Sequence, residues 1–224
     1  MPTTYGNDIV YCLKSHCGVR GYCRQKWVLQ VQIICKFSNE RTCKRNKDVQ
    51  GLSCGFEVKI SNYKTYLSLD LDLTVDDDRP IILIGGANGG GKTTLFEAIS
   101  GALYGLKIEN KEHFMELLNQ GALNTAKPEI SLQITFVGKV LGQQQKYILK
   151  RVYQLNPQGK PLESVSLNMN GNMYVYGTMT APKDRVKAEQ EINKIIKANL
   201  TQELSQYFLF DAMQSSELLK KNVF

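Results

Sequence analysis

The segment at residues 79–105 limits most strongly what this chain can fold into, because it combines a short strand, a glycine-rich loop and a helix. The apolar run at residues 80–84 is typical of a buried parallel strand. Residues 86–93, GANGGGKT, then match the pattern G-x-x-x-x-G-K-[ST]. In this pattern, backbone amides at the start of a helix surround phosphate groups. The flanking strand and helix are the context that the pattern requires.

The residue types in the loop fit the binding of a nucleoside triphosphate. Glycine lets several backbone N–H groups approach phosphate oxygens closely, because it has no Cβ. Lys92 is expected to reach the β- and γ-phosphates, and the Thr93 hydroxyl is expected to ligate Mg²⁺. Thr94 is placed to donate to the α-phosphate. The predicted cofactors are therefore ATP and Mg²⁺, held by Gly86, Gly89, Gly90, Gly91, Lys92, Thr93 and Thr94.

Hydrophobic periodicity predicts the elements on both sides of the loop. A strand beginning at residue 55, a turn at residues 62–64 and a strand at residues 67–75 precede it, with Leu67 placed on the same face as Leu69, Leu71 and Leu73. Helical spacing after the loop predicts a buried face made of Leu95, Ala98, Ile99, Ala102 and Leu103.

The rest of the chain alternates between hairpin and helix signals. The predicted elements are a helix at 106–123, strands at 128–137 and 146–155 around a polar turn at 139–145, a hairpin of 162–169 and 173–178 with an Asn-Gly turn, an amphipathic helix at 182–199, a short strand or turn at 206–211, and a helix from 215. This pattern favours an α/β fold, a P-loop NTPase lobe with a mixed sheet and β-hairpins.

Residues 1–54 differ in composition from residues 55–224. This leader holds nine Lys or Arg against three Asp or Glu, and it contains all six cysteines. It has no C-x-x-C pair, which gives little support for a zinc module. Three interpretations stay open: sequence foreign to the domain, a metal or partner module, or an unremarkable arm. The basic charge of the leader could touch nucleic acid or could belong to a solvated or disordered arm. We expect the fold to lie in residues 55–224, with the leader apart from it.

Composition narrows the class of protein. The chain has 224 residues, 42% of them hydrophobic and 22% charged, which is ordinary for a globular protein. No apolar run approaches the roughly 20 residues of a membrane span, and residues 1–8 do not resemble a signal peptide. We therefore expect a cytoplasmic protein with no membrane partner, where association with the nucleoid is an option.

The motifs together resemble the N-terminal ATPase half of the SMC/SbcC-type ATPases, and within them the DNA-phosphorothioation proteins of the DndD type. The supporting stretches are N-Y-K at residues 62–64, the loop with its helix at 82–105, Y-x-x-x-R-x-Y at 147–153, and 207–211. The family commonly has Gly-Glu after the last stretch, which is lost here. The resemblance covers residues 55–224.

The resemblance implies further site residues and partners. Asn62 and Lys64 would lie near the phosphates, Asn88 would act within the loop, and Asp211 or Gln214 would sense Mg²⁺ and the attacking water. For Asp211, a helix N-cap is the alternative. The implied partners are DNA and a C-terminal ATPase half or second head.

Two elements needed for hydrolysis are missing after residue 105. No apolar strand is followed by an Asp-Glu pair, and no signature loop follows. In the family both come after a coiled coil, which would begin where this chain stops. We therefore expect one half of an ATPase that acts in DNA repair or modification. The alternatives are a transport-type ABC ATPase subunit, for which Tyr63 or Tyr66 could stack on adenine, and a non-catalytic nucleotide-binding fragment.

Overall fold

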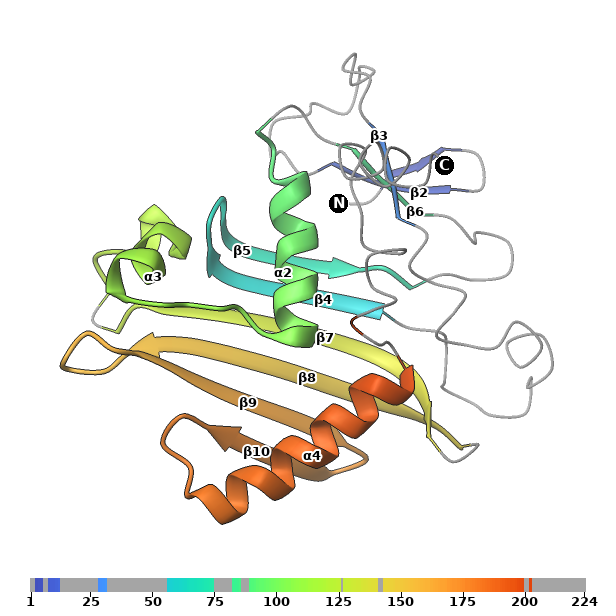
Figure 1. Ribbon diagram of the computed structural model, residues 1–224. Coiled ribbons are helices and arrows are strands. Elements are labelled where there is room, and N and C mark those ends of the chain that lie inside the picture. Colours follow the sequence, from blue (N-terminus) through green and yellow to red (C-terminus); the bar gives the residue numbers. More distant parts are fainter. Residues whose placement is uncertain are drawn as a thin grey trace, which may run out of the picture.

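The structure, a computed structural model, describes residues 3–5, 8–12, 28–31, 56–74, 82–85, 89–125, 127–140, 143–199 and 202. In this part of the chain, two sheets and three α-helices form an α/β fold (Figure 1). This confirms the predicted α/β class with its β-hairpins.

The larger sheet is antiparallel throughout, with the strand order β10-β9-β8-β7-β4-β5. Its strands are β4 (Phe56–Tyr63), β5 (Tyr66–Asp72), β7 (Glu129–Val140), β8 (Gln143–Leu155), β9 (Pro161–Met169) and β10 (Asn172–Gly177). Alternating residues along these strands are apolar, and one face of the sheet therefore forms the core. Val58, Ile60, Leu132, Ile134 and Leu149 are all fully buried there.

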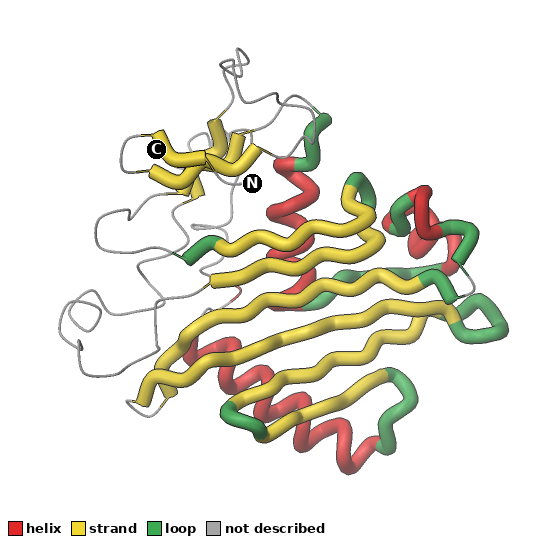
Figure 2. Tube along the Cα trace, turned by 180° about the vertical axis from the view of Figure 1, so that it is seen from behind, coloured by secondary structure: helices red, strands yellow, loops and turns green. Residues whose placement is uncertain are grey.

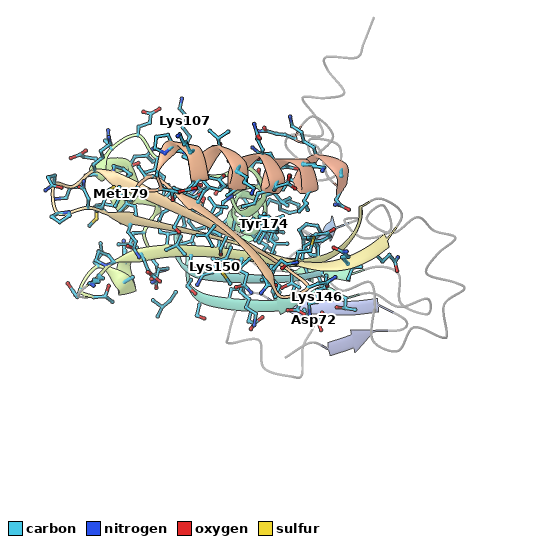
Figure 3. The ribbon with its side chains drawn as sticks, turned by 90° about the horizontal axis from the view of Figure 1, so that it is seen from below. Asp72, Lys107, Lys146, Lys150, Tyr174 and Met179 are labelled. Carbon is cyan, nitrogen blue, oxygen red and sulfur yellow. The ribbon has the colours of Figure 1, made fainter. Side chains whose placement is uncertain are left out.

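Helices cover one face of this sheet. α2 (Lys92–Tyr104) packs on β4, β7 and β8, and α4 (Pro182–Asn199) packs on β7 and β10 (Figure 1). Figure 2 shows the opposite face, which no helix of the described chain covers. In Figure 3, Tyr174 lies between α4 and the sheet, whereas Asp72 lies on the opposite side. The predicted apolar face of α2 is confirmed, since all five of its residues are buried.

The smaller sheet is mixed and has the order β1-β2-β6-β3. It contains β1 (Thr3–Tyr5), β2 (Asp8–Cys12), β3 (Val28–Val31) and β6 (Ile82–Gly85). The strand predicted before the loop is β6, which pairs in parallel with β2 and antiparallel with β3. We expected the leader to lie apart from the fold, yet two of its strands flank β6. A boundary at residue 54 stays a prediction.

Two predicted turns and one predicted buried residue differ from the structure. The first hairpin turns at Lys64 and Thr65, because Tyr63 still pairs with Tyr66. Leu67 is 54% exposed, so it does not share the buried face of Leu71. The polar turn predicted at residues 139–145 is mostly strand, since the β7–β8 pairing reaches Val140 and Gln143.

The helix predicted at residues 106–123 is broken into two short pieces. The Asn110 side chain accepts a hydrogen bond from the His113 amide and thereby starts α3 at Lys111 (Lys111–Leu117). Leu118 is extended and forms a β-bridge with Tyr63, which ends the helix. A single 3-10 turn, η1 (Gln120–Ala122), follows.

The hairpin predicted at residues 162–178 and the helix predicted at residues 182–199 are confirmed. Asn170 and Gly171 join β9 to β10 with φ values of 49° and 84°, as an Asn-Gly two-residue turn requires. In α4 the three predicted inward residues, Ile192, Ile195 and Ile196, are buried. No helix of the described residues is long and apolar enough to cross a membrane. The elements predicted after residue 205 lie outside the described residues.

Candidate functional site

The described part of the glycine loop turns tightly into α2. Gly89 and Gly91 have φ values of 70° and 93°, in the left-handed region that glycine enters without strain. Gly91 is the residue at the N-cap of α2, and it offers no side chain that could accept the free N–H groups of the first turn. Lys92, Thr93 and Thr94 form that turn, and Thr93 is exposed. This arrangement places amides and a hydroxyl at the positive end of a helix.

The tip of the β4–β5 hairpin packs directly against this turn. The Tyr66 hydroxyl donates a 2.9 Å hydrogen bond to the Gly91 carbonyl. A Cβ on Gly91 would lie 2.6 Å from the Tyr66 hydroxyl oxygen and 2.9 Å from the Thr65 hydroxyl oxygen. Only glycine therefore fits at this position, for reasons of both φ and space.

Lys64 lies in the same tip and reaches toward α2. Its ammonium nitrogen is 2.5 Å from a carboxylate oxygen of Glu97, in the second turn of α2. Its backbone has a φ of 46°, and its N–H donates to the Leu117 carbonyl at 2.7 Å. The tip is thus fixed in place beside the start of α2, which is the neighbourhood that the resemblance implies for Lys64.

Asn62 makes its hydrogen bonds within the fold, and the place near the phosphates that the resemblance implies for it stays a prediction. Its side-chain amide donates to the Glu129 carbonyl at 2.9 Å, and its own carbonyl accepts from the Asn119 amide at 3.0 Å. Its φ of 56° is one that asparagine tolerates better than most residues. These contacts join the hairpin to β7 and to the turn after α3, so the side chain of Asn62 serves the fold.

Tyr63 and Tyr66 are too buried to stack on a base. Their exposed fractions are 2% and 7%. Burial raises the pKa of Tyr66 to about 12. Burial, with a contribution from the charge of Glu97, also raises the pKa of Tyr63 above its ordinary value. Neither ring offers a free face, and this removes the adenine-stacking role that the transport-type alternative gave them.

The opposite end of α2 is held by Arg151 of β8, the arginine of the Y-x-x-x-R-x-Y pattern. Its guanidinium donates to the Ala102 carbonyl at 2.9 Å and to the Leu103 carbonyl at 3.0 Å. It also pairs with Glu163 of β9 at 2.8 Å. These carbonyls lack partners within the helix, so Arg151 caps α2 and places a positive charge at its negative end.

The residues expected to hold Mg²⁺ fit a site built mainly from nucleotide and water. The exposed Thr93 hydroxyl is the protein ligand that the loop offers. Among the described residues there is no group of three or more His, Cys, Asp and Glu side chains that could hold an ion. Magnesium in phosphate sites commonly keeps several waters and binds substrate oxygens, so one hydroxyl is compatible with it.

Some predicted residues cannot be placed. Gly86 and Asn88 of the loop, and Asp211 and Gln214 of the proposed sensing region, lie outside the described residues. The structure brings Lys64 to Glu97 in the second turn of α2, and it brings Tyr66 of the same hairpin tip to Gly91. The nucleotide-contacting roles of all these residues stay predictions.

Sequence reasoning missed two acidic residues of this region. Glu97 is one helical turn beyond Thr93, and its spacing could have suggested a partner for a nearby cation. Glu163 had no local signal, because its pairing with Arg151 depends on the register of β8 and β9. A cleft of about 570 Å³ lies elsewhere, among β7 to β10 and the turn at residues 178–180, and none of the predicted residues lines it.

Comparison with known proteins places this chain in a family. A family model described as an AAA domain matches residues 57–223, which is about three quarters of the chain. A search of the curated proteins gave no match. The matched segment includes the β4–β5 hairpin, the loop, α2 and Arg151. The chain therefore belongs to the AAA domain family, whose members bind and hydrolyse ATP with Mg²⁺, and this agrees with the broad resemblance of its motifs to SMC/SbcC-type ATPases.

Proposed function

We propose that this chain is the N-terminal nucleotide-binding lobe of an SMC/SbcC-type head, and that it binds Mg²⁺-ATP at the start of α2. One observation carries the proposal. Gly91 turns into α2 with a φ of 93° against the Tyr66 side chain, with no space for a Cβ, and this supports a backbone cradle for phosphate.

The described residues suggest how the triphosphate is held. The first-turn amides of α2, with the positive end of the helix dipole, face the phosphate oxygens. Lys92 supplies the charge for the β- and γ-phosphates, and Thr93 supplies a hydroxyl for Mg²⁺. Lys64, which pairs with Glu97 one helical turn beyond Thr93, would add a second cation to the site. When bound, Mg²⁺ neutralises charge on the phosphate oxygens.

Hydrolysis is proposed to need a partner. Water activation in this class uses a carboxylate pair after an apolar strand, and residues 106–224 contain no such pair. A C-terminal half or a second head would provide it. Closure of two heads around ATP, and their reopening after hydrolysis, would then be coupled to DNA. Double-strand break repair and DNA sulfur modification are the processes that the motif resemblance suggests, in the cytoplasm or at the nucleoid.

Calorimetric titration of the full chain with Mg²⁺-ATP tests the proposal, with the Lys92→Ala variant as comparison. We expect saturable binding to the wild-type chain and its loss in Lys92→Ala, with the same melting temperature for both. ATP affinity that is equal in the two proteins would overturn the site. Turnover is measured on the same samples, and ATP hydrolysis by the chain alone would overturn the half-domain part of the proposal.

A non-catalytic nucleotide-binding role is the second candidate. It is favoured by the absence of a carboxylate pair after an apolar strand in residues 106–224. Adding a C-terminal ATPase half from an SMC/SbcC-type protein would separate the two candidates. Turnover that appears with the added half supports the ATPase, whereas binding without turnover in every mixture supports the scaffold.

A further inference from the structure

Arg151 is a buried cation whose hydrogen bonds join the end of α2 to Glu163 of β9. It is only 4% exposed, although it carries a full positive charge in the middle of β8. Two of its donors meet the last carbonyls of α2, and a third meets Glu163. A buried charge is costly unless it is paired and hydrogen-bonded, and here it is both.

Glu163 and Tyr153 hold the guanidinium in this orientation. The Tyr153 hydroxyl donates to the same Glu163 oxygen at 3.0 Å, and it accepts from the Leu106 amide at 2.8 Å. The Glu163 backbone in turn pairs with Thr178, whose N–H donates to the Glu163 carbonyl at 2.9 Å. The chain that leaves α2 is therefore fixed to β8, β9 and the turn after β10.

α2 is in contact with the large sheet at both of its ends. At its start, Tyr66 contacts Gly91, where no Cβ would fit. At its end, a Cβ on Gly101 would lie 2.5 Å from the Leu106 side chain and 3.1 Å from Leu132 of β7. The last turns of α2 therefore pack closely on Leu106 and on β7, and the groups that hold its last turn contribute to its direction.

A small tilt of α2 about its last turn moves its first turn by a large distance. The helix has 13 residues, and at about 1.5 Å per residue it is about 20 Å long. A tilt of about 5° about the last turn would move the first turn by about 1.7 Å, more than the spread of about 0.5 Å in hydrogen-bond lengths. Phosphate-binding amides and Lys92 would lose their alignment.

We propose that Arg151 is a positioning residue for nucleotide binding, which fixes the direction of α2 from its C-terminal end and so aligns the phosphate-binding turn at the other end. The inference rests on the proposed function and adds a residue about one helix length away from the ligand. Glu163 is its positioning partner.

Arg151→Lys is the decisive variant, because it keeps the charge but loses the planar fork that meets three acceptors. We expect its affinity for Mg²⁺-ATP to fall about tenfold in calorimetric titration. The ¹⁵N–¹H signals of Gly89 and Gly91 in the nucleotide-free chain are expected to shift as well. Glu163→Gln is expected to show the same changes at smaller size, since an amide oxygen still accepts from Arg151.

Ile192→Val is the matched control. It removes one buried methylene from α4, which packs on β7 and β10, and leaves the Arg151 contacts in place. We expect a lower melting temperature with unchanged ATP affinity and unchanged glycine signals. Arg151→Lys with wild-type affinity and wild-type glycine signals would overturn the inference and leave Arg151 with a structural role alone.

The two proposals fail in different ways. Absence of ATP binding by the wild-type chain would overturn the proposed function. Wild-type binding that is lost in Lys92→Ala but unchanged in Arg151→Lys would leave the proposed function standing and overturn the positioning role alone.

Discussion

The hydroxyl of Tyr66 lies 2.9 Å from the carbonyl oxygen of Gly91, and this hydrogen bond joins the β4–β5 hairpin to the first residue before α2. The same carbonyl accepts the Leu95 amide at 2.8 Å, so it belongs to the helix as well. A residue 25 positions earlier in the chain therefore contributes to the shape of the turn that leads into α2.

Tyr66→Phe is expected to destabilise the chain modestly without unfolding it. The Gly91 carbonyl keeps its helical partner, so no buried acceptor is left unsatisfied, and the cost is that of one hydrogen bond, about 0.5–1.5 kcal/mol. Urea unfolding monitored by circular dichroism measures this difference. Tyr174→Phe is the control, because Tyr174 has no hydrogen-bond partner among the described residues. A loss of the same size in both variants would contradict the prediction.

Gly91→Ala is expected to abolish ATP binding. The new Cβ meets the Tyr66 ring and the Thr65 hydroxyl, and a φ of 93° costs a non-glycine residue about 1–3 kcal/mol. The turn must change shape to relieve both, and its amides then lose their common direction. Equilibrium titration with Mg²⁺-ATP checks this.

Gly171→Ala tests whether backbone strain far from the candidate site also affects ATP binding. Gly171 has a φ of 84° in the β9–β10 turn, but a Cβ there would have nothing within 4 Å. This variant therefore pays the conformational cost far from the loop, and we expect its ATP affinity to equal that of the wild type. Loss of binding in Gly171→Ala would show that general destabilisation explains the effect of Gly91→Ala.

Local patterns predicted the elements whose residues carry strong signals of their own. The loop and α2 follow from glycine spacing and a 3.6-residue period, and the β9–β10 turn follows from Asn170 and Gly171. The helix at residues 106–123 was wrong, because Asn110 and the Tyr63–Leu118 bridge compete with helical spacing. The Asn110 cap is a local signal that hydrophobic periodicity does not include, whereas the Tyr63–Leu118 bridge depends on a tertiary contact.

The candidate site likewise has features that the sequence predicts and features that it does not. Gly91 and Lys92 could be named from the sequence because the phosphate-loop pattern specifies their types and their spacing, and their contact with a nucleotide stays a prediction. The contacts of Tyr66 with Gly91 and of Lys64 with Glu97 could not, since they depend on where a hairpin tip lies relative to a helix start. Arg151 could be named only from a resemblance, and its partner Glu163 is fixed by strand register.

Lys64→Ala is expected to weaken ATP binding about tenfold while changing stability little. Its pair with Glu97 is partly exposed, and such pairs contribute about 0–1 kcal/mol to folding. A charge-assisted contact with a phosphate is worth more, about 1.5–3 kcal/mol. Glu97→Gln frees the ammonium, so ATP affinity should stay equal or increase. Titration calorimetry measures both variants.

Lys59→Ala is the control for this experiment. Lys59 pairs with Asp70 at 2.7 Å on the same two strands, away from the hairpin tip. Its removal takes away one positive charge and one exposed ion pair, as Lys64→Ala does. We expect wild-type affinity for Lys59→Ala. Equal losses in the two lysine variants would indicate a general effect of net charge and would remove Lys64 from the site.

Alkaline pH is expected to unfold the chain through its buried tyrosines, with a measurable share from Tyr66. Burial raises the pKa of Tyr66 from 10.0 to about 12, so the folded chain keeps the phenolic proton in a range where the unfolded chain has lost it. The contribution of Tyr66 to the free energy of unfolding is fully present below pH 10, and it falls by about 1.4 kcal/mol for each pH unit up to about 12. Tyr66→Phe has no proton to lose at this position, so its free energy of unfolding should decline less steeply than that of the wild type.

Urea unfolding of both proteins at pH 9, 10 and 11 measures the two slopes. Parallel slopes would mean that Tyr66 ionises in the folded state at its ordinary pKa, which would contradict its burial against Gly91.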